Sequence, residues 1–103
     1  METTKKDYGL RYSFAGKAAF ERRTKRSTTT LFSESIVDGN LSMSGVQDFY
    51  WIMTYHQNKG VIPPEDIDIP EDELDDVMLA IFNELNRWIQ HRNEITKAAT
   101  ASQ

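Results

Sequence analysis

The chain has 103 residues, which suits a single domain, because division into two would leave neither half with a core. It contains no cysteine, so a disulfide framework and a thiolate zinc site are both excluded. The formal charge of −4 is unevenly spread: residues 1–35 carry eight Lys or Arg against four acids, and residues 60–103 carry ten acids against three bases.

This uneven charge favours electrostatically matched contacts between protein surfaces, and the acidic half would repel a nucleic acid duplex. No apolar run approaches the roughly 20 residues that are required to cross a bilayer. The first seven residues also lack the apolar stretch of a secretion signal. We therefore expect an intracellular protein that has no membrane partner and whose main partner is not nucleic acid.

The N-terminal region begins with alternating apolar residues. Tyr8, Leu10, Tyr12 and Phe14 are separated by single small or polar residues, and this period of two predicts a short β-strand. No second strand is evident nearby. The strand is therefore expected to pair either with an irregular segment or with another subunit.

Two short helices are expected to follow the strand. The first spans residues 15–24 and has Ser13 as its N-cap. The second includes residues 31–36 and is expected to end at Asp38-Gly39-Asn40, where the glycine suits a left-handed C-terminal cap.

A third helix has the clearest start signal. Ser44 and Gln47 fit a capping box, while Ser42 is a competing N-cap, and Asn58-Lys59-Gly60 is expected to stop the helix. Its inner face is formed by apolar and aromatic residues at helical spacing, namely Val46, Phe49, Tyr50 and Met53.

The final helix is the most strongly amphipathic, with Pro70 at its first position and an end near Asn93. Its apolar stripe consists of Leu74, Val77, Met78, Ile81, Leu85, Trp88 and Ile89. We therefore predict a mainly α fold in which residues 1–95 form one small domain of about four helices with one short N-terminal β-strand. Residues 96–103 are predicted to be a flexible C-terminal tail.

An acidic run precedes the final helix, because eight of the twelve residues from Glu65 to Asp76 are carboxylates. Asp66 and Asp68 begin like a calcium loop, but Pro70 occupies the third ligand position and the sharp-turn glycine is missing. We therefore predict no metal site. Carboxylates at a helix start are favoured by the helix dipole, and they can also dock a basic partner.

Catalytic signatures are missing from the sequence. His56 and His91 are predicted to lie on different helices, and too few other metal ligands accompany them. No serine lies in a nucleophile elbow, and the isolated glycines form no phosphate-binding loop. We therefore expect no enzymatic activity and no cofactor.

The candidate functional residues are contact residues for other proteins. A basic run on the charged side of the first helix and just after it comprises Lys17, Arg22, Arg23, Lys25 and Arg26. It suits the helix dipole, and it offers a surface to an acidic subunit or, as the less favoured alternative, to phosphates. Aromatic residues beside the main apolar stripe of a helix tend to mark contacts between chains. The candidate partner-binding residues are Arg22, Arg23, Arg26, Trp51, Asp72, Asp75, Asp76 and Phe82.

Four stretches within residues 8–60 carry a family resemblance, through hydrophobic patterns and without a catalytic signature. They are Leu10-Arg11-Tyr12-Ser13-Phe14, Ala18-Ala19-Phe20-Glu21 with Arg26-Ser27, Leu41-Ser42-Met43, and Phe49-Tyr50-Trp51-Ile52-Met53. In this order the chain resembles the small tail assembly chaperones of long-tailed, siphovirus-type bacteriophages and prophages. The Pro63-Pro64 turn and the acidic final helix are less typical of that family.

The resemblance implies a non-enzymatic protein of the bacterial host cytoplasm. Such a protein would bind and shield the tape measure protein while the tail tube polymerises, contact other tail proteins, and form a homo-oligomer. Two alternatives stay open from the sequence: another small phage or bacterial adaptor, such as a head–tail completion protein, and a nucleic-acid-binding regulator.

Overall fold

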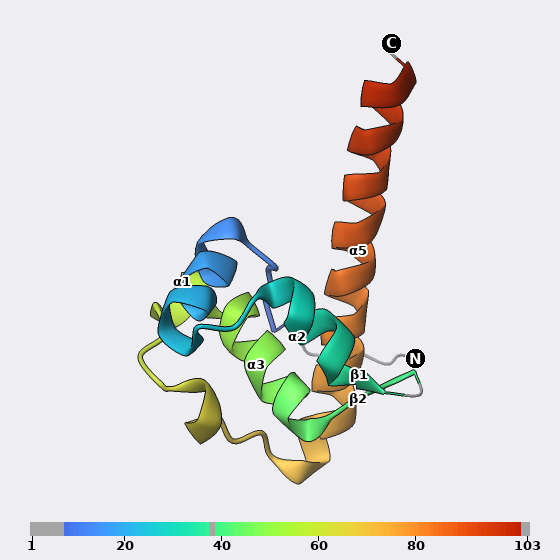
Figure 1. Ribbon diagram of the computed structural model, residues 1–103. Helices are drawn as coiled ribbons and strands as arrows, with labels where there is room; N and C mark the ends of the chain where they lie inside the picture. Colours follow the sequence, from blue (N-terminus) through green and yellow to red (C-terminus); the bar gives the residue numbers. More distant parts are fainter. Residues whose placement is uncertain (1–7, 38, 102–103) are drawn as a thin grey trace.

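The computed structural model describes residues 8–37 and 39–101 (Figure 1). The elements are, in chain order, α1 (Phe14–Thr24), α2 (Thr28–Ser35), β1 (Ile36–Val37), β2 (Asn40–Leu41), α3 (Met43–Met53), α4 (Tyr55–Asn58), the 3-10 helices η1 (Pro64–Asp66) and η2 (Glu71–Glu73), and α5 (Leu74–Ala101). The predicted mainly α class is confirmed.

Helix α3 is central, because α1, α2, α5 and η1 all contact it. Its side chains are buried on nearly every face, as expected for a helix that is surrounded by other elements. The predicted stripe of α5 packs against the same core. The buried hydrophobic residues are Tyr12, Ala19, Phe20, Leu31, Leu41, Val46, Phe49, Trp51, Ile52, Met53, Val77, Ile81 and Leu85.

Serine side chains begin the first three helices. The predicted N-cap Ser13 is confirmed, since its Oγ accepts the N–H of Gly16 at 3.0 Å. Of the two alternatives for α3, Ser42 is the N-cap, so the capping box that began at Ser44 is wrong. The reason is that the Gln47 amide donates to the carbonyl of Ile67 at 2.8 Å instead of turning back onto the helix.

The predicted N-terminal strand is absent from the described residues, because residues 8–13 form an irregular segment that runs into α1. Gly9 has a φ of 63°, which is incompatible with a strand, and the Gln57 amide donates to its carbonyl at 3.1 Å. Tyr12 is buried whereas Phe14 is 83% exposed, although a strand would place both on one face. Phe14 is instead the first residue of α1.

A small hairpin joins α2 to α3. Strands β1 and β2 are antiparallel and pair Ile36 with Leu41. The predicted left-handed glycine is confirmed, because Gly39 has a φ of 80°, but it lies in the hairpin turn and not in a helix cap. Asp38 lies outside the described residues.

The last helix begins later and continues further than predicted. Pro70 has an extended ψ of 141° and precedes η2, so α5 begins at Leu74. The backbone remains helical past Asn93 to Ala101, and this part of α5 projects away from the other elements (Figure 1). The flexibility of residues 96–103 stays a prediction, and the last two residues lie outside the described part of the chain.

The close approach of α1 to α3 at Gly16 can be tested by substitution. A Cβ atom at Gly16 would lie 2.4 Å from the carbonyl oxygen of Ile52. Alanine normally stabilises a helix by about 0.5–1 kcal/mol relative to glycine. We expect Gly16→Ala to lower the free energy of unfolding by about 1–3 kcal/mol in urea titrations, because α1 must move away from α3. The exposed neighbouring variant Ala15→Gly should lose less than 1 kcal/mol, and a stabilised Gly16→Ala variant would contradict the packing.

Candidate functional site

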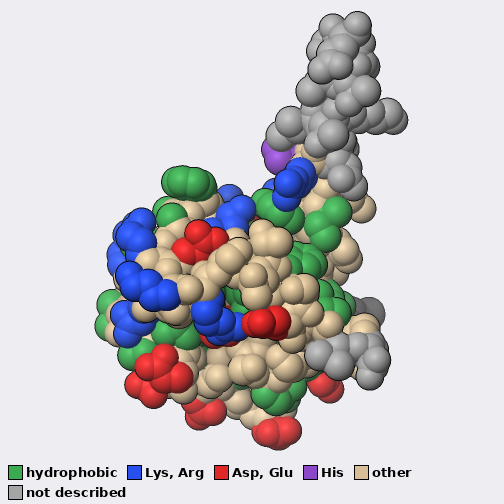
Figure 2. All heavy atoms as spheres, viewed as in Figure 1, with side chains coloured by type: hydrophobic (Ala, Val, Ile, Leu, Met, Phe, Trp, Pro, Cys, Tyr) green, Lys and Arg blue, Asp and Glu red, His purple; other side chains and the backbone are tan. Residues whose placement is uncertain are grey.

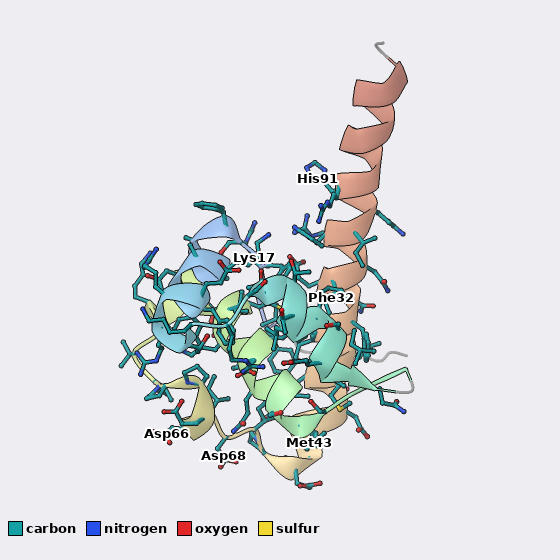
Figure 3. The ribbon with its side chains drawn as sticks, viewed as in Figure 1. Lys17, Phe32, Met43, Asp66, Asp68 and His91 are labelled. Atoms are coloured by element: carbon teal, nitrogen blue, oxygen red, sulfur yellow. The ribbon has the colours of Figure 1, made fainter. Side chains whose placement is uncertain are left out.

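A groove of about 500 Å³ opens between α1, α2 and α5. Its walls combine apolar or aromatic side chains with two cations, and the residues that define it are Tyr12, Lys17, Phe32, Trp88, Ile89 and Arg92. Figure 3 shows Lys17 on α1 and Phe32 on α2. The remaining lining residues, all on α2, carry hydroxyl groups, so no described lining residue is acidic.

The floor of the groove is aromatic. The rings of Tyr12 and Trp88 meet edge to face, with centroids 5.1 Å apart and an interplanar angle of 87°. Tyr12 also packs against Phe49 of α3, with centroids 5.9 Å apart, which joins the floor to the core. Burial raises the pKa of Tyr12 to about 12, so this phenol is neutral at physiological pH.

Two cations lie against these rings. The Nζ of Lys17 is 4.7 Å from the Tyr12 centroid and 4.6 Å from the Trp88 centroid. On the same indole, the guanidinium carbon of Arg92 is 5.4 Å from the ring centroid. These distances are typical of cation–π contacts. Burial lowers the pKa of Lys17, the charge of Arg92 lowers it further, and Glu21 opposes the shift.

A buried carboxylate holds the two sides of the groove together. Glu84 of α5 is 8% exposed, and it accepts the backbone N–H of Tyr12 at 2.7 Å. The guanidinium of Arg87 donates to the same carboxylate at 2.8 Å and 2.6 Å. Burial raises the pKa of Glu84, but these hydrogen bonds outweigh burial and hold that pKa below its usual value. The segment before α1 is thereby fixed against α5.

The first two helices are joined beside the groove by Glu21. Its carboxylate accepts the backbone N–H of Thr28 at 2.9 Å and the Thr28 hydroxyl at 3.1 Å. This contact links the last turns of α1 to the first turn of α2. The wall that carries Phe32 is therefore positioned relative to the wall that carries Lys17.

The predicted basic residues have different surroundings. Arg22 and Arg23 are exposed on the last turn of α1, as a partner contact requires. Arg26 has an internal role, because it donates to buried Asp48 at 3.1 Å and pairs with Glu34 at 3.5 Å. Burial raises the pKa of Asp48 and Arg26 opposes this shift, so removal of Arg26 would leave a buried carboxylate without its partner.

The predicted acidic residues lie at the other end of the molecule. Figure 2 shows Lys and Arg side chains gathered over α1, and several acidic side chains at the lower end of the same face. Asp72 and Asp75 are exposed at the junction of η2 and α5, while Asp76 is half-buried. The structure therefore does not bring the basic and acidic candidates together within one chain.

The assignment of Trp51 to a partner surface is corrected by its burial. This residue is 4% exposed, and its ring packs against Phe20 and Tyr55 with centroids 6.0 Å and 5.6 Å apart. Because neighbours cover α3 on several sides, a position beside the main stripe is also buried. Phe82 is partly buried against the same core.

The groove residues were not predicted as a site from the sequence. Tyr12 was assigned to a strand face, Lys17 to a charged helix face and Trp88 to the α5 stripe. Three separate elements supply them, so no local spacing connects them. The one local signal is the pair Trp88 and Arg92, which lie four residues apart and therefore face the same side of α5.

The described residues contain no group of three or more His, Asp or Glu side chains that could hold a metal ion. His56 on α4 and His91 on α5 are both exposed. Among the described helices, none has the length and apolarity that a membrane span requires. Comparison of the chain with protein-family models, curated proteins and solved structures gave no match.

The Glu84 contact predicts a pH-dependent contribution to stability. A carboxyl whose pKa is lower in the folded state stabilises the fold above its unfolded pKa, and this contribution is lost as pH falls through the folded pKa. We expect Glu84→Gln to reduce the free energy of unfolding by about 1–3 kcal/mol at pH 7, and by progressively less below pH ~4.5. Urea titrations across this range measure the difference. The exposed control Glu71→Gln should show little change, and a pH-independent loss in Glu84→Gln would contradict the assignment.

Proposed function

We propose that this chain is a non-enzymatic assembly chaperone that binds the tape measure protein of a long-tailed phage in the bacterial host cytoplasm. The observation that carries the proposal is the open groove beside the projecting part of α5. A chaperone of this kind must offer an apolar surface to client segments that would otherwise be exposed. The order of α1, α2 and α3, with their Ala18-Ala19-Phe20-Glu21 and Leu41-Ser42-Met43 stretches, supports the resemblance to phage tail assembly chaperones.

The groove suits a helical client for a physical reason. Amphipathic helices bind in apolar grooves through side chains spaced by three or four residues, and Trp88, Phe32 and Ile89 form such a surface. Its volume lies in the range of ordinary ligand sites. Phe14, which is 83% exposed on α1, adds apolar surface outside the groove.

The proposal is tested by co-expression with a candidate tape measure protein, which would be a long helical chain encoded by a neighbouring gene. We expect the two to co-purify and the client to stay soluble. Trp88→Ser should weaken retention of the client on the tagged chaperone by at least about tenfold, because an aromatic anchor of the groove is lost. Light scattering and quantitative pull-down measure the complex. Met43→Ser removes a 56%-exposed apolar side chain from α3 and is the matched control. Failure of the wild-type chain to bind this client would contradict the proposal.

Self-association is a further part of the proposed function. Arg22 and Arg23 lie on α1, and Asp72 and Asp75 lie near the start of α5, so one molecule can present its basic surface to the acidic surface of the next. A contact between two different surfaces is heterologous, and it forms either a closed ring or an open helix of subunits. Either arrangement would allow several copies to cover a long client.

Charge reversal tests this self-association. Arg22→Glu/Arg23→Glu and Asp72→Lys/Asp75→Lys should each sediment as smaller species than the wild type at low salt, because like charges then meet at the contact. An equimolar mixture of the two variants should associate again, since opposite charges are restored between different molecules. Sedimentation velocity measures all three samples. Association that persists unchanged in both single-surface variants would exclude this contact.

A further inference from the structure

The groove contains two positively charged side chains that contact one aromatic ring. Lys17 and Arg92 contact the same Trp88 ring, and the charge of Arg92 disfavours the charged form of Lys17. Glu21 is the described carboxylate that acts on Lys17, and it already accepts two hydrogen bonds from Thr28. An anion placed between the two cations would relieve their repulsion, and the partial burial of Lys17 strengthens such an interaction.

The surface next to the cations is apolar. Phe32 and Ile89 are half-buried lining residues, and the partly buried Trp88, whose ring contacts Lys17, lines the same groove. A simple inorganic anion would leave this surface in contact with water. The groove therefore fits a ligand in which an apolar group and a carboxylate are close together.

Apolar surface extends beyond the groove on α1. Phe14 lies one turn before Lys17 on the same face of α1 and is 83% exposed. On the other side, α5 continues past Arg92 to Ala101 and projects from the molecule (Figure 1). An elongated ligand can therefore contact both helices. A second helix packs on such a surface at an interaxial distance of about 8–10 Å.

We infer that the groove binds an amphipathic client helix that places a large apolar side chain against Trp88 and Phe32, and an Asp or Glu one turn away between Lys17 and Arg92. This inference rests on the proposed function, and it states the chemistry of the client segment. A second copy of the chain is a poorer occupant. The apolar residues next to its acidic residues 65–76 are Leu74 and Val77, which are partly and fully buried in their own core. They are therefore not free to enter the groove of another molecule.

The chemistry is tested with the ¹⁵N-labelled full chain and synthetic peptides. The first peptide is an amphipathic 18-mer with Leu and Phe at helical spacing and Glu one turn from each, and its twin carries Gln for Glu. We expect the acidic peptide to shift the indole N–H resonance of Trp88 and to leave that of buried Trp51 unchanged. It should bind at least about tenfold more tightly than its twin, because charge-assisted hydrogen bonds are lost in the twin.

Charge-neutralising variants separate the groove from general electrostatics. Lys17→Gln/Arg92→Gln should bring the affinity for the acidic peptide down to that for its twin. Lys59→Gln/Lys25→Gln removes the same charge from exposed positions and should bind like the wild type. Equal affinity of the two peptides for the wild-type chain would overturn the inference. Tighter binding of a peptide of residues 64–80 would also overturn it, in favour of a second copy as the occupant.

Client retention distinguishes this inference from the proposed function. If the tape measure protein binds the wild type and is lost from Lys17→Gln/Arg92→Gln, the inference is supported. If it binds both proteins equally, the inference fails while the proposed function stands. If it binds neither protein, the proposed function fails. The inference about the client then also fails, even if the acidic peptide still shifts the indole N–H resonance of Trp88.

Discussion

The near-complete burial of α3 is the constraint on which the rest of the chain depends. From Gly45 to Thr54 no residue is exposed, because α1, α2, α5 and η1 pack around this helix. A helix in this position has no polar face, so a buried polar side chain costs free energy unless it is hydrogen-bonded. Asp48 is paired with Arg26, and the Thr54 hydroxyl donates to the carbonyl of Tyr50 at 2.7 Å. Arg26, which follows α1, is therefore held by a contact with the central helix.

Local sequence signals predicted those features that one or two neighbouring residues determine. Ser13 was predicted as an N-cap because a hydroxyl before a helix has a local hydrogen-bond partner, and the α5 stripe followed from its period. Trp51 was assigned to the surface for a related reason. A helical period identifies the most apolar face, but it does not reveal how many neighbours cover the other faces. Burial of Trp51 depends on the surrounding elements and not on its own helix.

Contacts between distant residues explain why the strand and the groove were not predicted correctly. The N–H of Tyr12 is bonded to Glu84, which is 72 positions away in the chain, and the carbonyl of Gly9 is bonded to Gln57. An alternating apolar pattern cannot distinguish a strand from a segment that is held by such side chains. The groove likewise requires α1, α2 and α5 to meet, and the Glu84 hydrogen bonds position that meeting point.

The two basic regions of this chain differ in their physical character, and this difference bears on the proposed function. Arg22 and Arg23 are exposed, so their attraction for acidic surfaces acts over distance and is weakened by salt. Lys17 and Arg92 lie on aromatic rings, and Lys17 is half-buried, so its interaction with a ligand is short-ranged and less screened. Long-range charge mainly accelerates encounter, whereas contacts in a desolvated groove mainly slow dissociation. An assembly chaperone built in this way would control subunit association and client release through separate surfaces, and a client could therefore be released without dispersal of the subunits around it.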